Sequence, residues 1–211
     1  MLKAILLILE PVATWEKILL ARRSVAFIIV INLLPLLLVT SACEGYGLIH
    51  WGKQRGQMRE IAHMKPFTRG EAVLIETGQI LLSLVVVFVG TNMVKSLSET
   101  FHGRSTYTQA FSSVAYGLGP FFLLHALDAF PSVSPWVTWG VGISLASVAL
   151  YHGLPRMMEP DPSHAFGLFL MSSVLLVFLT GLVRFVTWWF LSGKFVKLEA
   201  VVSDLAARLP F

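Results

Sequence analysis

The sequence predicts an all-α, polytopic membrane protein with five transmembrane helices and an N-terminal interfacial amphipathic helix. Five apolar stretches carry this prediction, at about residues 25–43, 73–94, 107–130, 136–154 and 165–191. Each is close to the ~20 residues that a helix needs to cross a hydrocarbon core ~30 Å thick. Only 13% of the 211 residues are charged and 55% are hydrophobic, which is typical of helices surrounded by lipid.

The few charged residues of the second half of the chain lie mostly in the breaks between the apolar stretches. From Tyr107 to Leu191 they are Asp128, Arg156, Glu159, Asp161 and Arg184. This placement fits a membrane protein, since one charge at the bilayer centre costs at least ~2.5–3.5 kcal/mol. The net charge of +4 indicates basic loops against anionic lipid, because no basic stripe with interleaved aromatics suggests a nucleic-acid partner.

Residues 1–23 are predicted to form the interfacial amphipathic helix. The apolar run at 4–9 is too short for a signal peptide, and no small-residue cleavage site follows it before Glu10 and Pro11, so the segment is expected to be retained. Residues 15–20 are amphipathic, which is the pattern of a helix that lies on the membrane surface. Residues 24–193 then form the transmembrane domain, and 194–211 form a short amphipathic C-terminal tail.

The first two spans are joined by the one long polar connection in the chain. A kink is expected near Asn32 and Pro35 within the first span, because proline removes a backbone donor. The connection at 44–71 is basic, and its part at 51–61 could form a short surface helix. Glu76 is expected at the start of the second helix, where the helix N-terminus stabilises a carboxylate.

The third, fourth and fifth spans are separated by turn-forming residues. The sequence from Gly117 to Pro120 interrupts the third span, and the connection at 131–135 is short enough to make spans three and four antiparallel neighbours. Ser163 is a candidate N-cap for the fifth helix. Small residues that suit close helix packing or contact with a partner are Ser113, Gly117, Gly119, Pro120, Gly140 and Ser144.

Membrane orientation is only weakly determined by the basic residues. Five spans place the two termini on opposite faces, and the two faces carry similar numbers of Lys and Arg. Arg22 and Arg23 flank the first span, whose flanking charges usually dominate, so a cytoplasmic N-terminus is favoured.

Short motifs along most of the chain resemble those of the bacterial branch of the Yip family, the Ypt-interacting membrane proteins. They are Pro11–Ile18 before the first span, Phe101–Tyr107 entering the third, Tyr116–Pro120 within it, Trp136 and Tyr151–Leu154. The resemblance implies five membrane helices and a cytoplasmic N-terminus. Eukaryotic members bind small GTPases and one another in vesicle transport. This chain lacks their long polar N-terminal region and keeps only Gly119-Pro120 of their acidic signature, so GTPase binding is not implied.

Polar residues within the spans are candidates for a functional site, because unpaired polar groups are costly in lipid. They are Glu76, Asn92, His125, Asp128, His152 and Arg184. Structural roles are favoured for Asp128, His152 and Arg184, which lie near span ends. His125 and Asp128 share a helix face and are expected to hydrogen-bond. Glu76 is the strongest functional candidate and could pair with Arg184.

No motif for catalysis, metal binding or cofactor binding stands out. The loop residues His50, His63, His102 and Glu99 lack zinc-like spacing, so no metal site is expected. No phosphate-binding loop, dinucleotide motif or nucleophile elbow occurs, so neither an enzyme nor a cofactor is expected. Cys43 is the sole cysteine, which excludes an intrachain disulfide.

The sequence therefore predicts a non-enzymatic scaffold or accessory subunit in a cell membrane, with the bacterial inner membrane expected. Its partners would be membrane lipids, other membrane proteins or a second copy, contacted through the small-residue faces. The alternative is a small transporter or channel that uses Glu76, His125 and Arg184. A lipid-modifying enzyme ranks last, because no paired catalytic residues are present.

Overall fold

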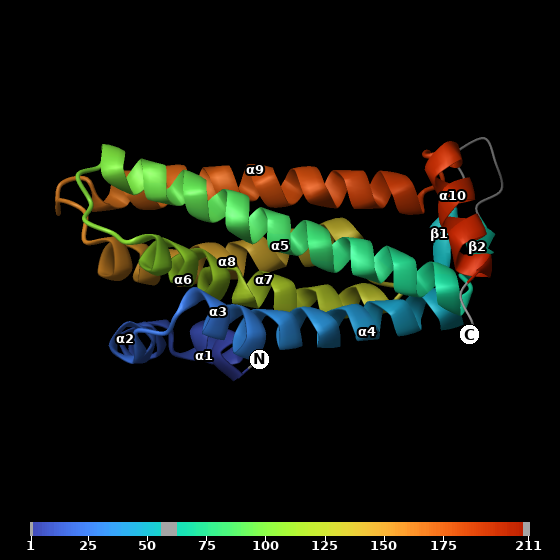
Figure 1. The fold of residues 1–211 in the computed structure, drawn as a ribbon, viewed down its shortest axis with the longest axis horizontal. Coiled ribbons are helices and arrows are strands. Elements are labelled where there is room, and N and C mark those ends of the chain that lie inside the picture. Colours follow the sequence, from blue (N-terminus) through green and yellow to red (C-terminus); the bar gives the residue numbers. More distant parts are fainter. Residues whose placement is uncertain (1, 56–62, 209–211) are drawn as a thin grey trace.

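Five long helices run side by side in the computed structural model, which describes residues 2–55 and 63–208 (Figure 1). All five are long and apolar enough to cross a membrane. The predicted all-α membrane fold with five spans is therefore confirmed.

The first span consists of three consecutive segments: α3 (Val25–Ile28), the π-helical turn η1 (Ile29–Leu33) and α4 (Leu34–His50). Pro35 is the second residue of α4, just after the π-helical turn, and its missing N–H explains why the regular helical bonding changes there. The kink expected near Asn32 and Pro35 thus takes the form of a π-helical turn. The helix continues past the predicted end at residue 43, which places Glu44 inside it and buries this side chain.

A short antiparallel β-hairpin follows, in which β1 (Lys53–Arg55) pairs with β2 (His63–Lys65). The surface helix predicted over 51–61 is wrong at 53–55, where the chain is extended, and the rest of that segment from residue 56 lies outside the described residues. Gly52, just before β1, has a φ of +71°, a conformation that suits glycine and turns the chain out of α4.

The second span is the single long helix α5 (Arg69–Thr100). Thr68 and Glu71 form a reciprocal capping box at its start, with the Glu71 backbone N–H donating to Thr68 Oγ1 and the Thr68 N–H donating to Glu71 Oε2. Because the helix begins four residues earlier than predicted, Glu76 lies beyond its first turn. The helix N-terminus therefore does not stabilise its carboxylate.

The third span is the central element of the bundle. It is divided into α6 (Tyr107–Gly117), α7 (Gly119–Leu124) and the 3₁₀ turn η2 (His125–Ala129), with the break at the predicted Gly117–Pro120 position. The rest of the chain buries 72% of its apolar window, against 28–44% for the other four spans. The other helices thus surround this span, which leaves it little contact with lipid.

The last two spans are α8 (Pro135–Met158) and α9 (Ala165–Leu191). The tight connection at 131–135 brings η2 and α8 together as expected. Ser163 is not the N-cap of α9. That position belongs to His164, and the Ser163 hydroxyl donates instead to Asp161 Oδ1 at 3.1 Å.

The N-terminal segment forms two helices, α1 (Leu2–Leu9) and α2 (Pro11–Ala21), since Pro11 cannot continue the helix that precedes it. Both dock onto the bundle. Ala4 packs on Gly119 of α7, while the fully buried ring of Trp15 lies directly on Gly153 of α8. Trp15 Nε1 also donates to the carbonyl of Ala149 at 2.8 Å.

The C-terminal segment forms α10 (Val196–Ala207), which packs on the start of α5. Gly70 permits this contact, since a Cβ there would lie 2.9 Å from the carbonyl oxygen of Ala206. An ion pair of 2.7 Å between Lys65 and Glu199 also ties α10 to the hairpin. In Figure 1, α10 and the hairpin lie at one end of the bundle and α2 lies at the other.

Candidate functional site

Ionisable residues, most of them buried, gather at the hairpin end of the bundle. We call this group the polar cluster; it consists of Glu44, Lys53, Glu76, His125, Asp128 and Arg184. Its members come from α4, β1, α5, η2 and α9. Each of the three carboxylate residues and Arg184 is at most 8% exposed. Such burial inside an apolar bundle requires compensation by partner groups.

Asp128 and Arg184 form the best-paired part of the polar cluster. Arg184 Nη2 donates to Asp128 Oδ2 at 2.5 Å and to Thr138 Oγ1 at 2.9 Å. The Thr138 hydroxyl donates to Asp128 Oδ1 at 2.5 Å. Arg184 also donates to the carbonyl of Pro135, from Nε at 3.1 Å and from Nη2 at 2.7 Å. This network joins η2, α8 and α9, so that the buried charges are both paired and hydrogen-bonded.

The partner of Arg184 differs from the one expected. The sequence suggested that Glu76 could pair with it, but Arg184 is engaged by Asp128, Thr138 and Pro135 instead. The expected hydrogen bond between His125 and Asp128 is also not formed. The two carboxylate oxygens of Asp128 instead accept hydrogen bonds from Thr138 of α8 and Arg184 of α9.

Glu44 and Lys53 belong to the site although sequence reasoning missed both. Lys53 Nζ lies 3.8 Å from Glu44 Oε1 and donates to the carbonyl of Asp128 at 2.8 Å. Glu44 could have been found from the helical spacing of Thr40, Glu44 and Leu48, all of which are buried. Lys53 carries no such signal, because it reaches the cluster only through the turn at Gly52 that leads from α4 into the hairpin.

Two atoms of the cluster have no hydrogen-bond partner among the described residues: Glu76 Oε2 and His125 Nε2, both buried. Glu76 packs against α4, where its Cγ lies 3.3 Å from the position that a Cβ would take on Gly45. The His125 ring contacts the ring of Phe121 edge-on, with centroids 4.7 Å apart. Packing therefore helps to hold both side chains in place, while one polar atom of each stays unpaired.

Three members of the cluster could together hold a metal ion. The ligand atoms of Glu44, His125 and Asp128 lie within 4.8 Å of one another. They come from α4 and η2, and Glu44 and Asp128 are 84 positions apart in the chain. No metal-binding spacing motif could therefore detect them.

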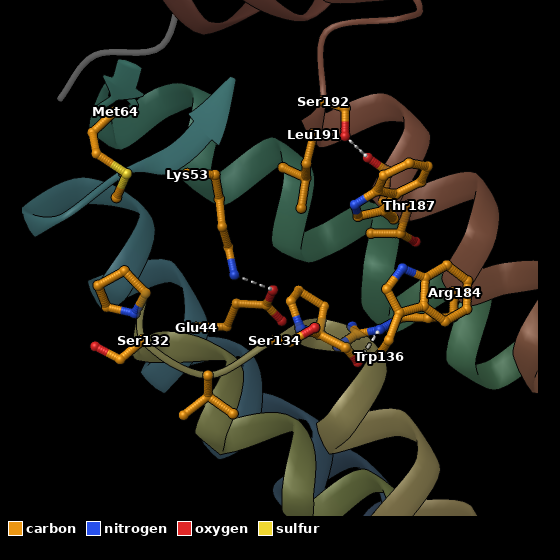
Figure 2. Close-up of a pocket in the computed structure, with 15 residues that line it drawn as sticks. Glu44, Lys53, Met64, Ser132, Ser134, Trp136, Arg184, Thr187, Leu191 and Ser192 are labelled. Carbon is orange, nitrogen blue, oxygen red and sulfur yellow. Dashed lines mark hydrogen bonds and ion pairs between the residues drawn. The ribbon is translucent and has the colours of Figure 1, made fainter. Parts of the chain in front are cut away.

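A cavity of about 380 Å³ opens onto this cluster from the surface (Figure 2). Glu44, Lys53 and Arg184 line it together with Trp136, Trp188 and Ser192. The two tryptophan rings lie 6.1 Å apart and are each about 40% exposed, at 38% and 40%. Their place at the ends of α8 and α9 matches the aromatic belt at a membrane boundary.

A second, water-sized void of about 20 Å³ adjoins Arg184 on the core side. Gln79, His125 and Thr187 line it, and Thr187 Oγ1 donates to Gln79 Oε1 at 3.1 Å. The remaining intramembrane candidates lie elsewhere. Asn92 is exposed and bonds to the carbonyl of Phe88, and His152 lies near the opposite end of α8.

The small residues singled out by the sequence fall into two sets. The buried set consists of Ser113, Gly117, Gly119 and Pro120, which pack against this chain's own helices. The outer set is Gly140 and Ser144. A Cβ on Gly140 would have no heavy atom within 4 Å, and Ser144 is exposed. The outer set is therefore open on the surface of the bundle, whereas the buried set packs inside it.

Comparison with known protein families gives one match. The family model described as the Yip1 domain matches residues 5–185. No curated protein and no solved structure is detectably similar to the chain. The match covers α1 to α9 up to Phe185 and therefore includes every residue of the polar cluster.

Proposed function

The chain belongs to the Yip1 domain family, and on that premise we propose that it is a non-enzymatic scaffold or accessory protein that holds a phospholipid headgroup in the cavity of the polar cluster. The proposed location is a cell membrane, in line with the resemblance to bacterial members. Binding of this kind would anchor the protein among particular lipids, from which its outer faces could meet other membrane proteins.

The observation that carries this proposal is the position of the cavity. It opens at the end of the bundle, between two tryptophans that are typical of the lipid headgroup level. Lys53 lines the cavity with only a loose 3.8 Å contact to Glu44, so its ammonium can meet a phosphate, and Ser192 adds a hydroxyl. A volume of about 380 Å³ lies within the ~300–1,000 Å³ common for small-ligand sites.

The half of the bundle away from the polar cluster favours lipid binding over ion conduction. Towards the end that carries α2, the core is closed by fully buried apolar side chains, among them Phe111, Val114 and Leu150. Hydroxyl groups such as those of Thr91, Ser98 and Ser113 are also buried there, but among the described residues no charged side chain is buried in that half. This arrangement gives no support to the alternative of a transporter or channel, which would need polar groups across the membrane.

The chemistry of the cluster also supports a non-enzymatic role. Its only imidazole, His125, has no hydroxyl or thiol on Nε2 within the described chain. The Thr138 hydroxyl next to its carboxylates donates to Asp128. A nucleophile paired with a base, which covalent catalysis requires, is therefore not assembled among these residues.

Lipid retention tests the proposal. The protein is reconstituted into nanodiscs of phosphatidylglycerol, phosphatidylethanolamine and phosphatidylcholine in equal parts, and released into detergent for native mass spectrometry. We expect one retained phospholipid per chain, and a roughly tenfold loss of retention in Lys53→Ala, since a hydrogen bond to a charged group contributes ~1.5–3 kcal/mol. Lys95→Ala is the matched control, because Lys95 pairs with Glu99 near the C-terminal end of α5, away from the cluster.

Retention that is equal in the native chain and in Lys53→Ala would contradict the headgroup site. Proton flux in liposomes addresses the alternative. We expect no flux above that of empty vesicles, and flux that disappears in Glu76→Gln would replace the binding proposal with transport.

A further inference from the structure

The polar cluster contains an electrostatic imbalance that its own residues do not resolve. Three buried carboxylates, Glu44, Glu76 and Asp128, face two cations, Lys53 and Arg184. With every group in its usual charged form, one negative charge is left over. Glu76 interacts electrostatically with Glu44, Lys53 and Asp128, so that this excess is shared by the whole cluster.

The unpaired atoms of the cluster are both good metal ligands. Glu76 Oε2 and His125 Nε2 are buried and have no hydrogen-bond partner among the described residues. Leaving such groups unpaired in an apolar interior is costly, and a bound ion is one of the arrangements that relieves the cost. Glu76 is only 8% exposed and belongs to a different helix from the three residues that already lie within ligand distance of one another.

We propose that Glu44, His125 and Asp128 bind a divalent transition-metal ion, with Glu76 beside them and the Lys53 ammonium as its competitor. The donor set of carboxylates and one imidazole suits Zn²⁺ or Mn²⁺. The ligand atoms lie within 4.8 Å of one another. Around a tetrahedral zinc ion they would lie roughly 3.3–3.6 Å apart, since each bond is ~2.0–2.2 Å long. Small side-chain rotations are enough to close this difference.

The charge balance explains why Lys53 would give way. If a divalent ion replaces its ammonium, the three carboxylates are neutralised by the ion and Arg184 together, and no excess charge remains. Lys53 is suited to leave, because it sits on the edge of the hairpin and lines the open cavity. Its contact with the Glu44 carboxylate is a loose 3.8 Å, and the bond it would give up is the 2.8 Å hydrogen bond to the Asp128 carbonyl.

The hydrogen bonds that Asp128 accepts would hold its carboxylate in position as a metal ligand. Arg184 and Thr138 each hold one of its carboxylate oxygens at 2.5 Å, which fixes the direction of the remaining lone pairs. Outer partners of this kind orient metal ligands and sharpen affinity.

Direct metal binding tests this inference. The protein is purified in detergent with lipid removed, and bound metal is removed with EDTA. It is then titrated with Zn²⁺ by calorimetry, and the absorption of bound Co²⁺ gives a second measurement. We expect one saturable site per chain, weakened at least tenfold in His125→Ala and in Glu76→Gln. The matched control is the double variant His102→Ala/His164→Ala, which removes two neighbouring rings 5.9 Å apart at the opposite end and should leave the site intact.

Lys53→Ala should have the opposite effect and increase the affinity for the metal ion. Removal of the competing ammonium should tighten metal binding several-fold, a result that a misfolded variant could not produce. The same variant should lose the retained phospholipid, so the metal site and the headgroup site can fail separately. Binding that persists in His125→Ala, or that vanishes in the control variant, would overturn the metal site.

Discussion

At the scale of single residues, the pair of Asp128 and Arg184 shows how this bundle tolerates a charge in its last span. The guanidinium lies among apolar helices, yet its Nε and Nη2 donate to Asp128, Thr138 and the Pro135 carbonyl. Buried pairs of this kind contribute little net stability compared with an apolar replacement, but removal of one partner leaves the other charge exposed to an apolar interior.

Arg184→Gln should therefore lower the free energy of unfolding by ~3–5 kcal/mol. Asp128→Asn in the same chain should restore part of the loss, because the uncompensated carboxylate is then removed as well. Thermal unfolding in detergent measures both effects. Arg156→Gln is the control, since Arg156 donates only to the carbonyl of His152 on its own helix. An additive double variant, with no recovery, would refute the pairing.

Only some residues of the site could be predicted from the sequence. Glu76, His125, Asp128 and Arg184 stood out because a polar group inside an apolar run is unusual, and all four belong to the cluster. Glu44 was missed because it follows the apolar run and reads as the start of a loop. Which charge pairs with which depends on tertiary contacts between helices distant in sequence, and no local pattern encodes them.

At the scale of elements, the spans were predictable and their ends were not. Apolar length alone determines that a helix crosses the membrane. The ends depend on polar residues that continue a helix, as Glu44 does in α4 and the Thr68–Glu71 capping box does for α5. The docking of α1 and α2 on the bundle was also not predicted, because a tryptophan such as Trp15 is equally typical of the membrane surface.

The docking of α1 should depend on pH through Lys3, which lies outside the spans. Burial, and to a lesser degree the charge of Arg23, hold the pKa of Lys3 below its usual 10.5. Its ammonium lies 3.4 Å from Tyr116 Oη. The undocked lysine then binds more protons than the docked one as pH rises towards 10.5, so docking should become more favourable through that window and stay constant below it.

Thermal unfolding followed from about pH 7 to pH 10 checks this dependence. Lys3→Met should flatten the part of the pH response that the native chain shows at the alkaline end. Lys17→Met, a change on the exposed side of α2, serves as the control. A pH response that is the same in Lys3→Met and in the native chain would show that Lys3 is not responsible.

At the scale of the whole molecule, the central position of the third span decides which surfaces can meet other proteins. Four spans enclose α6 and α7, so the glycines of that span serve internal packing. The outward face of α8 is different, since Gly140 has open space around it and Ser144 is exposed. A lateral partner or a second copy would therefore contact α8 rather than the Gly117 region.

Substitution at the two glycines separates these roles. Gly117→Ala should lower the free energy of unfolding by ~1–3 kcal/mol, because the added methyl group would overlap the side chain of Leu150. Gly140→Leu should change stability by less than ~0.5 kcal/mol, since it projects into lipid. If α8 is a contact face, Gly140→Leu should nevertheless remove proteins that co-purify in native detergent or nanodiscs. Equal recovery of such partners with Gly140→Leu would exclude this face, and an unchanged unfolding midpoint in Gly117→Ala would contradict the packing of the central span.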